Sequence, residues 1–175
     1  MTEIKVYADE IREAAAQLRA GQRVLFSGVA YTSRDAAHKR IIRLLDEGGE
    51  LPYPLRDATI YYAGPTPAPD GMPIGSCGPT TSGRMDIYTP RLLDLGLACM
   101  IGKGRRSQEV IDAIVRNRAV YLCAIGGAGA LAAQCIVKAD VIAFDDLGCE
   151  SVKRLVMKDF PLITAIDCTG TSVVR

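Results

Sequence analysis

Hydrophobic residues recur at helical spacing in two segments near the N-terminus. In residues 8–18 the apolar positions fall on one stripe, and they do so again in residues 33–47, just before Gly48 and Gly49. This spacing predicts two amphipathic helices with one buried face each, and the glycines end the second. Residues 23–27 form a short apolar run between them that predicts a strand. The stripes consist of Ile11, Ala14, Ala15 and Leu18, and of Ala37, Ile41, Leu44 and Leu45.

From residue 84 onward, segments with a helical pattern alternate with short apolar runs that are typical of strands. This alternation predicts an α/β fold with mixed α+β layers. A length of 175 residues fits a single domain over residues 1–175. Helices are expected at 84–95 (with a new start at Thr89-Pro90), 108–117 and 130–135, and strands at 97–101, 119–125, 141–144 and 162–167.

A stretch rich in proline and glycine interrupts this pattern. Residues 58–62 predict a strand with prolines on both sides. Residues 64–79 then contain five prolines and four glycines, a composition too irregular for a helix or strand. Because the flanking segments are too short to be separate domains, we expect an ordered active-site loop here rather than a linker.

The charges of the chain nearly cancel, with 21 Lys and Arg against 20 Asp and Glu. Without an excess of positive charge, nucleic acid and anionic membranes are not expected as partners, and an anion site has to be built locally. The sequence has no apolar run long enough to cross a bilayer, and its N-terminus is too polar for a signal peptide. The sequence therefore predicts a cytoplasmic protein.

Six cysteines are spread along the chain, with no two closer than twelve residues. Iron–sulfur and zinc sites commonly use closely spaced cysteines such as C-x-x-C, and this spacing does not occur here. We therefore expect no metal ligands in this chain and interpret Cys99, Cys123 and Cys135 as small buried hydrophobic residues. Cys77 differs, because it lies within a candidate anion-binding loop and is a candidate pocket residue.

That loop, Gly75–Met85, combines small hydroxyl residues with glycines and an arginine, directly ahead of a helical pattern. Glycines let backbone amides approach a ligand closely, and the planar guanidinium of Arg84 matches a carboxylate or phosphate. The expected ligand is a small anion. The alternative is structural: Ser82 caps the following helix, and Asp86 is a favourable charge in its first turn, although it is also a candidate pocket residue.

Two further cations lie at boundaries between predicted elements. Arg34 lies at the start of the second predicted helix, where it opposes the helix dipole, so a nearby anion is expected. His38, one turn later, is interpreted as a hydrogen-bonded helix residue, with a role in the pocket as the alternative. Lys103 stands between two glycines after a predicted strand, whereas Arg105 and Arg106 fit an exposed basic turn.

A glycine-rich turn at residues 124–130 follows another predicted strand. Neither this turn nor residues 101–106 have the spacing of a P-loop or a dinucleotide fingerprint, so nucleotide binding is the weaker alternative. Close packing of a strand on a helix is sufficient to explain the glycines. The cations Arg34, Arg84 and Lys103, each beside small residues, suit a dicarboxylate better than a neutral sugar.

These residues lie within five motifs that occur in the order of a known family. The chain resembles the β subunit of iron–sulfur-dependent hydro-lyases, the class I fumarase and L-tartrate dehydratase family, over residues 23–172. The motifs are Ser-Gly-Val-Ala-Tyr-Thr-Ser-Arg-Asp-Ala-Ala-His, Tyr-Ala-Gly-Pro-Thr-Pro, Gly-Pro-Thr-Thr-Ser-Gly-Arg-Met-Asp, Ile-Gly-Lys-Gly and Ala-Ile-Gly-Gly-Ala-Gly-Ala-Leu.

The resemblance implies an enzyme divided into two parts. In such families an α part holds a four-iron four-sulfur cluster through three cysteines, and the β part is a swivelling β/β/α-type domain that closes over it. This chain corresponds to the β part. The resemblance therefore implies a hetero-oligomer with a cluster-bearing α subunit, and a chain that is inactive alone.

The implied reaction is the reversible dehydration of a 2-hydroxydicarboxylate, most simply (S)-malate to fumarate. Arg34, Arg84 and Lys103 match the family positions that bind the substrate carboxylates, and Thr80 matches its proposed catalytic threonine. Thr81 would contribute hydrogen bonds to the substrate. Within the family, L-tartrate dehydratase is the alternative, and outside it a non-catalytic anion-binding module remains.

Overall fold

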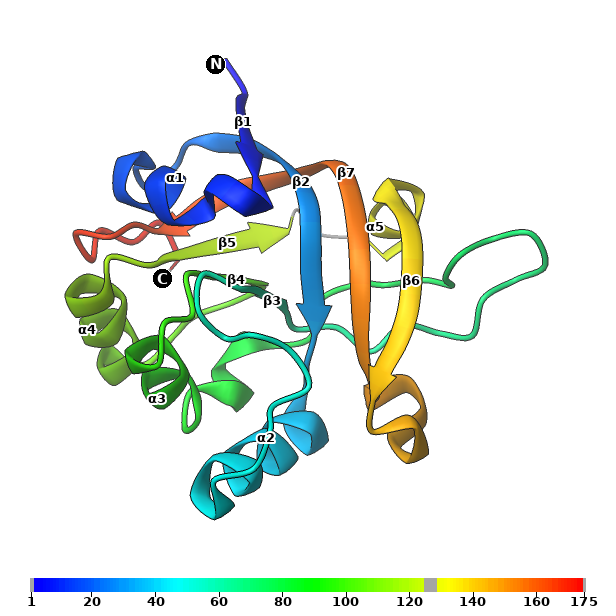
Figure 1. The fold of residues 1–175 in the computed structure, drawn as a ribbon. Helices are drawn as coiled ribbons and strands as arrows, with labels where there is room; N and C mark the ends of the chain where they lie inside the picture. The colour runs from blue at the N-terminus through cyan, green and yellow to red at the C-terminus, as the bar shows by residue number, and fades with distance from the viewer. Residues whose placement is uncertain (1, 125–128, 175) are drawn as a thin grey trace.

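The computed structural model describes residues 2–124 and 129–174, and within them the strands form one seven-stranded sheet (Figure 1). The order is β1-β2-β3-β4-β5-β7-β6. Neighbours from β1 to β5 run parallel, whereas β7 runs antiparallel to β2, β5 and β6. The strands are β1 (Ile4–Tyr7), β2 (Arg23–Thr32), β3 (Thr59–Tyr61), β4 (Cys99–Gly102), β5 (Val120–Ala124), β6 (Ile136–Ala143) and β7 (Val152–Ile166).

The sheet closes on itself because β7 pairs with both β2 and β5. The strands β2, β3, β4, β5 and β7 thus form a small barrel, and β1 and β6 extend it on either side. Phe26 of β2 pairs with Phe160 of β7, and the register shifts directly after this pair. Gly28, at the shift, has a φ of +117°, and a Cβ there would lie 2.6 Å from the Cβ of Ala8. The bulge therefore requires glycine.

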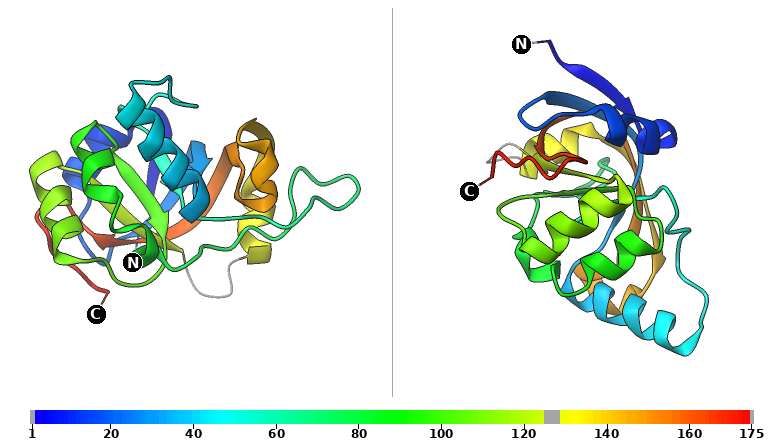
Figure 2. Two further views of the ribbon diagram at one scale, coloured as in Figure 1. Left: turned by 90° about the horizontal axis from the view of Figure 1, so that it is seen from below. Right: turned by 90° about the vertical axis from the view of Figure 1, so that its left-hand side faces the viewer.

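Helices surround this barrel, and α2, α3 and α4 lie on the same side of it (Figure 2). The neighbouring helices α3 and α4 pack against each other. The helices are α1 (Ile11–Gln17), α2 (Asp35–Glu47), α3 (Thr89–Asp94), α4 (Gln108–Asn117) and α5 (Gly129–Cys135), with the short 3₁₀ helices η1 (Ala8–Glu10), η2 (Ser82–Met85) and η3 (Asp145–Glu150).

Alternate residues of the strands pack into two hydrophobic clusters. In β4, Cys99 and Ile101 belong to a cluster that all five barrel strands share, whereas Met100 belongs to a cluster shared with α2, α3 and α4. The first cluster also takes in residues of α1 and α5, and the second holds α2, α3 and α4 against the other face of the strands. Every residue of β4 is buried, which explains why this strand is a continuous apolar run in the sequence rather than an alternating one.

The α/β class predicted from the sequence is confirmed, and most predicted elements are present. The helix predicted at 108–117 has the predicted bounds, and those predicted at 8–18 and 33–47 are shorter, at 11–17 and 35–47. The helix predicted at 84–95 is wrong in its first half, since η2 ends at Met85 and α3 begins at Thr89 with Pro90 in its first turn.

The strands depart further from the prediction. The strand predicted at 23–27 continues to Thr32, and those predicted at 141–144 and 162–167 are the ends of the longer β6 and β7. The four-residue β1 was not predicted, because so short a segment gives little pattern. The glycine-rich turn at residues 124–130 lies mostly outside the described residues, because residues 125–128 are not among them.

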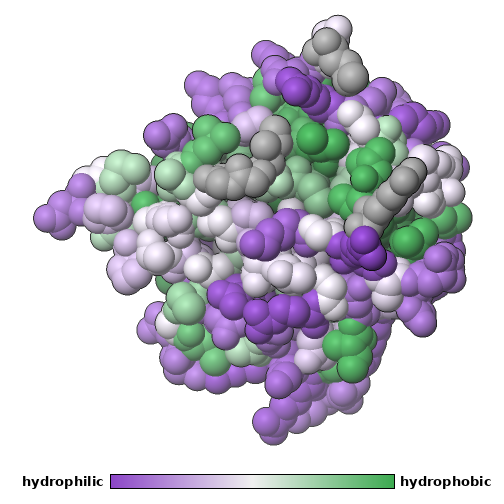
Figure 3. Space-filling view, turned by 180° about the vertical axis from the view of Figure 1, so that it is seen from behind, coloured by the Kyte–Doolittle hydropathy of each residue, from purple (hydrophilic) through white to green (hydrophobic). Residues whose placement is uncertain are grey.

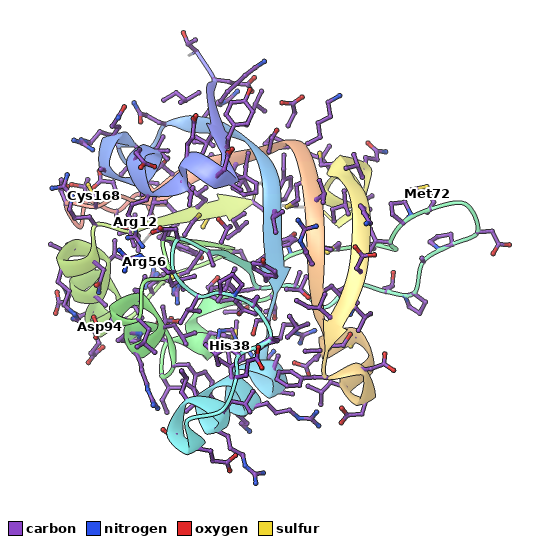
Figure 4. All side chains as sticks on the ribbon, viewed as in Figure 1. Arg12, His38, Arg56, Met72, Asp94 and Cys168 are labelled. Atoms are coloured by element: carbon purple, nitrogen blue, oxygen red, sulfur yellow. The ribbon has the colours of Figure 1, made fainter. Side chains whose placement is uncertain are left out.

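Residues 64–78 form a long loop without a helix or strand, as predicted. The loop projects from the barrel, and Met72 lies near its tip (Figure 4). Figure 3 shows the molecule from behind, where the same loop projects on the left. The amide of Thr66 donates a hydrogen bond to the carbonyl of Ser76 at 3.0 Å, which ties the two arms of the loop together. Within the described part of the chain, the helices lack the length and hydrophobicity that crossing a bilayer requires.

Candidate anion site at the carboxyl edge of the sheet

The parallel strands β2, β3 and β4 end at one edge of the sheet, where α/β folds commonly bind ligands. Arg34 follows the end of β2, and Lys103 follows β4 directly. The segment 79–84 crosses this edge. Its Thr80 amide donates to the carbonyl of Tyr62 at 2.7 Å, and Thr81 forms a parallel bridge with Lys103. The fold thus brings the motifs after β2, β3 and β4 to the same edge.

The crossing segment is anchored by Ser82, whose side chain is fully buried. Its Oγ accepts hydrogen bonds from the hydroxyl of Tyr121 at 2.9 Å and from the amide of Lys103 at 3.0 Å. A Cβ at Gly102 would lie 1.9 Å from this Oγ, so the approach requires glycine. The interpretation of Ser82 as a helix cap is wrong: Thr81 occupies the N-cap position of η2, and no side chain caps it there.

Anchoring at Ser82 leaves the preceding residues at the open edge. Thr80 is half-buried and Thr81 is exposed. Arg84 is exposed as well, and its Nε donates a hydrogen bond to Oδ1 of Asp35 at 3.1 Å. Asp35 is the first residue of α2, so this contact ties the 82–85 turn to the helix that follows β2.

Arg34 is more buried than Arg84 and lies between the segment after β3 and the turn before β7. Its Nε lies 3.7 Å from Oε1 of Glu150 in η3. A Cβ at Gly64 would lie 2.8 Å from Nη1 of Arg34 and 3.2 Å from the carbonyl oxygen of Cys149. The glycine of the Tyr-Ala-Gly-Pro motif therefore leaves room for the arginine side chain.

His38 is fully buried on the inner side of α2 (Figure 4). Its Nδ1 lies 2.9 Å from both the carbonyl oxygen of Arg34 and Oγ of Ser33. Burial lowers the pKa of His38 to about 4, because the charged imidazolium would lose its water. This geometry matches the interpretation of His38 as a hydrogen-bonded helix residue, and it fixes the backbone at Arg34.

Lys103 is exposed, but Arg106 is not, which corrects the expectation of an exposed basic turn. The side chain of Arg106 is fully buried, and its Nε donates to Oδ1 of Asp86 at 2.6 Å. The other oxygen of Asp86 accepts the amide of Ser107. Both carboxylate oxygens of Asp86, a candidate pocket residue, are therefore used in structural contacts. Asp86 pairs with the buried Arg106 instead of acting as a favourable charge at the start of a helix.

Cys77 is also corrected, since its side chain is fully buried in the barrel cluster and does not line an accessible surface. Burial raises the pKa of its thiol to about 12. Among the described residues, no group of three or more His, Cys, Asp and Glu side chains could hold a metal ion.

Sequence reasoning missed two residues at this edge. Glu150 lies far from Arg34 in the chain, and no local spacing links them, so only the pairing of β7 with β2 reveals the contact. Gly64 is part of a motif quoted above, but the sequence does not show why glycine is needed there. The reason is that the Arg34 side chain passes this position in the folded structure.

The fold and this edge together define an α/β barrel whose parallel strands end beside two arginines and a lysine. The chain belongs to the family described as Fumarase C-terminus, which it matches over residues 1–175. The resemblance to this family inferred from the sequence motifs is thereby confirmed.

Similar proteins bear the names of hydro-lyases. The chain is 40% identical over 163 residues to the anaerobic class I fumarate hydratase of Escherichia coli strain K12, covering 92% of this chain and 30% of that protein. It is 36% identical over 173 residues to fumarate hydratase 2 of Leishmania major, covering 98% of this chain and 30% of that protein. The chain thus spans less than a third of these relatives.

A third relative is closer to this chain in length. It is a Methanocaldococcus jannaschii protein provisionally named L(+)-tartrate dehydratase subunit beta, with 37% identity over 163 residues. The match covers 90% of this chain and 84% of that protein. The region shared by all three relatives therefore occurs both within long proteins and as most of a short one.

Proposed function

We propose that this chain is a single-domain β subunit of an iron–sulfur hydro-lyase that reversibly dehydrates (S)-malate to fumarate. The observation that carries the proposal is the placement of Arg34, Arg84 and Lys103 at one sheet edge, which the segment with Thr80 and Thr81 crosses. Membership of the Fumarase C-terminus family supports hydro-lyase chemistry.

The cations account for the recognition of a dicarboxylate. Arg34 and Arg84 offer guanidinium forks that pair with carboxylates, and Lys103 offers an exposed ammonium group. Thr81 adds a hydroxyl beside Lys103. When a proton leaves the carbon next to a carboxylate, negative charge grows on that carboxylate. Fixed cations at this position stabilise the charge as it develops, which lowers the barrier.

Thr80 is our candidate for proton transfer. Its amide is fixed to the carbonyl of Tyr62, so the residue is held at the sheet edge. A threonine hydroxyl is a weak base, and it removes a proton only when another group accepts its own. We propose that a carboxylate of the partner chain accepts it. The alternative role for Thr80 is to orient the substrate through a hydrogen bond.

Among the described residues the cysteines are not gathered as the ligands of a four-iron four-sulfur cluster, since no three metal-ligating side chains come together. Such clusters bind thiolates, whereas Cys77 and Cys99 are fully buried and burial raises the pKa values of both thiols. We therefore propose that a separate α subunit holds the cluster and that the two chains act as a hetero-oligomer. This chain is then inactive alone. Its cytoplasmic location stays a prediction from the sequence.

A second candidate is the β subunit of an L-tartrate dehydratase. The match to the Methanocaldococcus jannaschii protein favours it, because that relative bears this name and shares 84% of its length with this chain. Malate and tartrate differ by one hydroxyl group, and both carry the two carboxylates that the arginines would bind. The partner chain would then supply the part of the pocket that separates them.

The test is an anaerobic purification of the tagged chain from its native cells, followed by assays of iron, of fumarate formation from malate and of tartrate dehydration. An Arg84→Ala chain purified in the same way is the control, since its exposed ion pair is not needed for folding. Bound iron with fumarate formation, lost in the Arg84→Ala chain, supports the malate reaction. Tartrate dehydration alone favours the second candidate. A chain without partner, iron or turnover leaves only an anion-binding module.

A further inference from the structure

Two carboxylates lie against the two arginines at the start of α2. Oε1 of Glu150 is 3.7 Å from Nε of Arg34, and it accepts the backbone amide of Ala36 at 3.5 Å. Oδ1 of Asp35 accepts a hydrogen bond from Nε of Arg84 at 3.1 Å. The Arg84–Asp35 contact is thus a hydrogen bond and the Arg34–Glu150 contact an ion pair without one, and both carboxylates lie beside the first turn of α2.

In both pairs the carboxylate lies against Nε of the arginine. Within residues 2–124 and 129–174, the hydrogen bonds of the structure leave the Nη atoms of Arg34 and Arg84 without a protein acceptor. The Arg34 side chain is further confined, because it passes between Gly64 and the carbonyl of Cys149. Among the described residues the terminal forks thus have no protein acceptor, while Nε of Arg84 is hydrogen-bonded to Asp35 and Nε of Arg34 lies at ion-pair distance from Glu150 without a hydrogen bond.

We propose that Glu150 and Asp35 are positioning residues, with Glu150 orienting Arg34 and Asp35 orienting Arg84 for the carboxylates of a substrate. This inference rests on the proposed function, because it concerns the same dicarboxylate site. A long side chain that is already held loses less conformational freedom when a ligand binds, so pre-orientation strengthens binding. Glu150 also compensates the charge of the partly buried Arg34.

The structure offers a matched control in another ion pair between the α2 region and η3. Arg40 of α2 pairs with Asp146 of η3, as Arg34 pairs with Glu150, but both side chains of the control pair are largely exposed. Breaking the Arg40–Asp146 pair therefore removes an α2–η3 contact without touching either of the arginines assigned to substrate. If substitution of Glu150 weakens ligand binding and substitution of Asp146 does not, the loss is not caused by a general loosening of η3.

The experiment measures binding of succinate, a four-carbon dicarboxylate without a hydroxyl group, to the assembled protein by calorimetry. We expect Glu150→Gln and Asp35→Asn each to raise the Kd for succinate about fivefold, whereas Asp146→Asn leaves it within about twofold. The effect of Glu150→Gln should vanish in an Arg34→Gln background and persist in an Arg84→Gln background. The effect of Asp35→Asn should show the reverse dependence.

Unfolding midpoints of the same variants separate positioning from stability. A Kd that is unchanged or lower in Glu150→Gln and Asp35→Asn overturns the inference, as does an effect that persists without the matched arginine. If Arg34→Gln and Arg84→Gln still weaken binding in that case, the proposed function stands. Succinate binding that is indifferent to both arginines contradicts the proposed function, and the inference fails with it.

Discussion

Arg106 and Lys103 belong to the same glycine-containing turn after β4, but the fold treats them in opposite ways. Arg106 is fully buried, with its guanidinium over the rings of Tyr62 and Tyr121 at 5.2 and 4.9 Å from their centroids, and paired with Asp86. Lys103 is exposed at the sheet edge, where its backbone amide and carbonyl form hydrogen bonds with Ser82. One cation is part of the core, and the other faces solvent.

The same contrast extends over the whole edge of the sheet. We call Arg106, Asp86, Tyr62 and Tyr121 the buried arginine network, and Arg34, Arg84 and Lys103 the edge cations. In the network, Nε, Nη1 and Nη2 of Arg106 all have acceptors in the protein. The edge cations keep donors that the described residues do not use. A cation with unused donors at a strand end is the better candidate for ligand binding.

Removing the buried cation is the strongest way to test this contrast. Arg106→Ala leaves Asp86 with an uncompensated charge and empties the space between two tyrosine rings. We expect a loss of about 4 kcal/mol in the free energy of unfolding, since breaking a buried ion pair costs several kcal/mol. Urea titration measures this loss. The neighbouring exposed Arg105→Ala is the control and should change stability by less than about 0.5 kcal/mol. Equal effects of both variants would contradict the contrast.

His38 provides a second test on the buried side, through pH. Its pKa in the folded protein is about 4, against an ordinary value of 6.5, because burial disfavours the charged ring. Nearby Arg106 acts in the same direction, whereas Asp35 opposes it. The folded state therefore binds a proton less readily than the unfolded state. The contribution of neutral His38 to the free energy of unfolding is complete above the pKa of histidine in the unfolded chain. It is lost as the pH falls toward the pKa of His38 in the folded protein, by up to about 3 kcal/mol.

The measurement compares urea titrations of the native protein and of His38→Gln at pH values above and below that window. We expect the native protein to lose more stability on acidification than the variant does, because glutamine does not titrate. Parallel losses in the two proteins would show that other groups cause the acid sensitivity. His38 would then be insignificant for the pH dependence.

The difference between the two groups of cations also explains what the sequence could predict. Arg34, Arg84 and Lys103 were found because each stands beside glycine or small residues at a boundary that periodicity reveals. Arg106 was misjudged because its neighbours in sequence, Arg105 and Ser107, suggest an exposed turn. Its burial comes from Asp86 and the tyrosines, which reach it only in the folded chain.

The fold was predictable to a similar extent. Helix α4 was predicted with its observed bounds, because a clear apolar stripe follows the capping residue Ser107. The closure of the barrel was not predicted, since it depends on β7 pairing with β2 and β5 across the chain. Glu150 was missed for the same reason, because this pairing carries the preceding turn to Arg34.

Among the edge cations, we expect the largest functional effect from Arg84. Arg84→Ala should lower kcat/KM of the assembled enzyme on the order of a hundredfold, because a substrate carboxylate would lose its charged partner. This corresponds to a loss of about 3 kcal/mol in transition-state stabilisation. The free energy of unfolding should change by less than about 1 kcal/mol, since the Arg84–Asp35 pair is half-exposed. The control is Arg91→Ala, which removes another exposed ion pair, with Asp46. Equal kinetics of both variants would remove Arg84 from the site.

Lys103 should show the smallest effect of the group and the clearest separation of function from stability. Lys103→Met keeps the length of the side chain and removes its charge, while the backbone contacts with Ser82 remain. We expect kcat/KM to fall about tenfold, the value of one hydrogen bond to a charged group, with an unchanged unfolding midpoint. Lys39→Met, at an exposed position of α2, is the control and should alter neither quantity. A lower unfolding midpoint for Lys103→Met with unaltered kinetics would give Lys103 a structural role, as Arg106 has. Arg34 and Arg84 would then be the only candidate carboxylate ligands among the described cations.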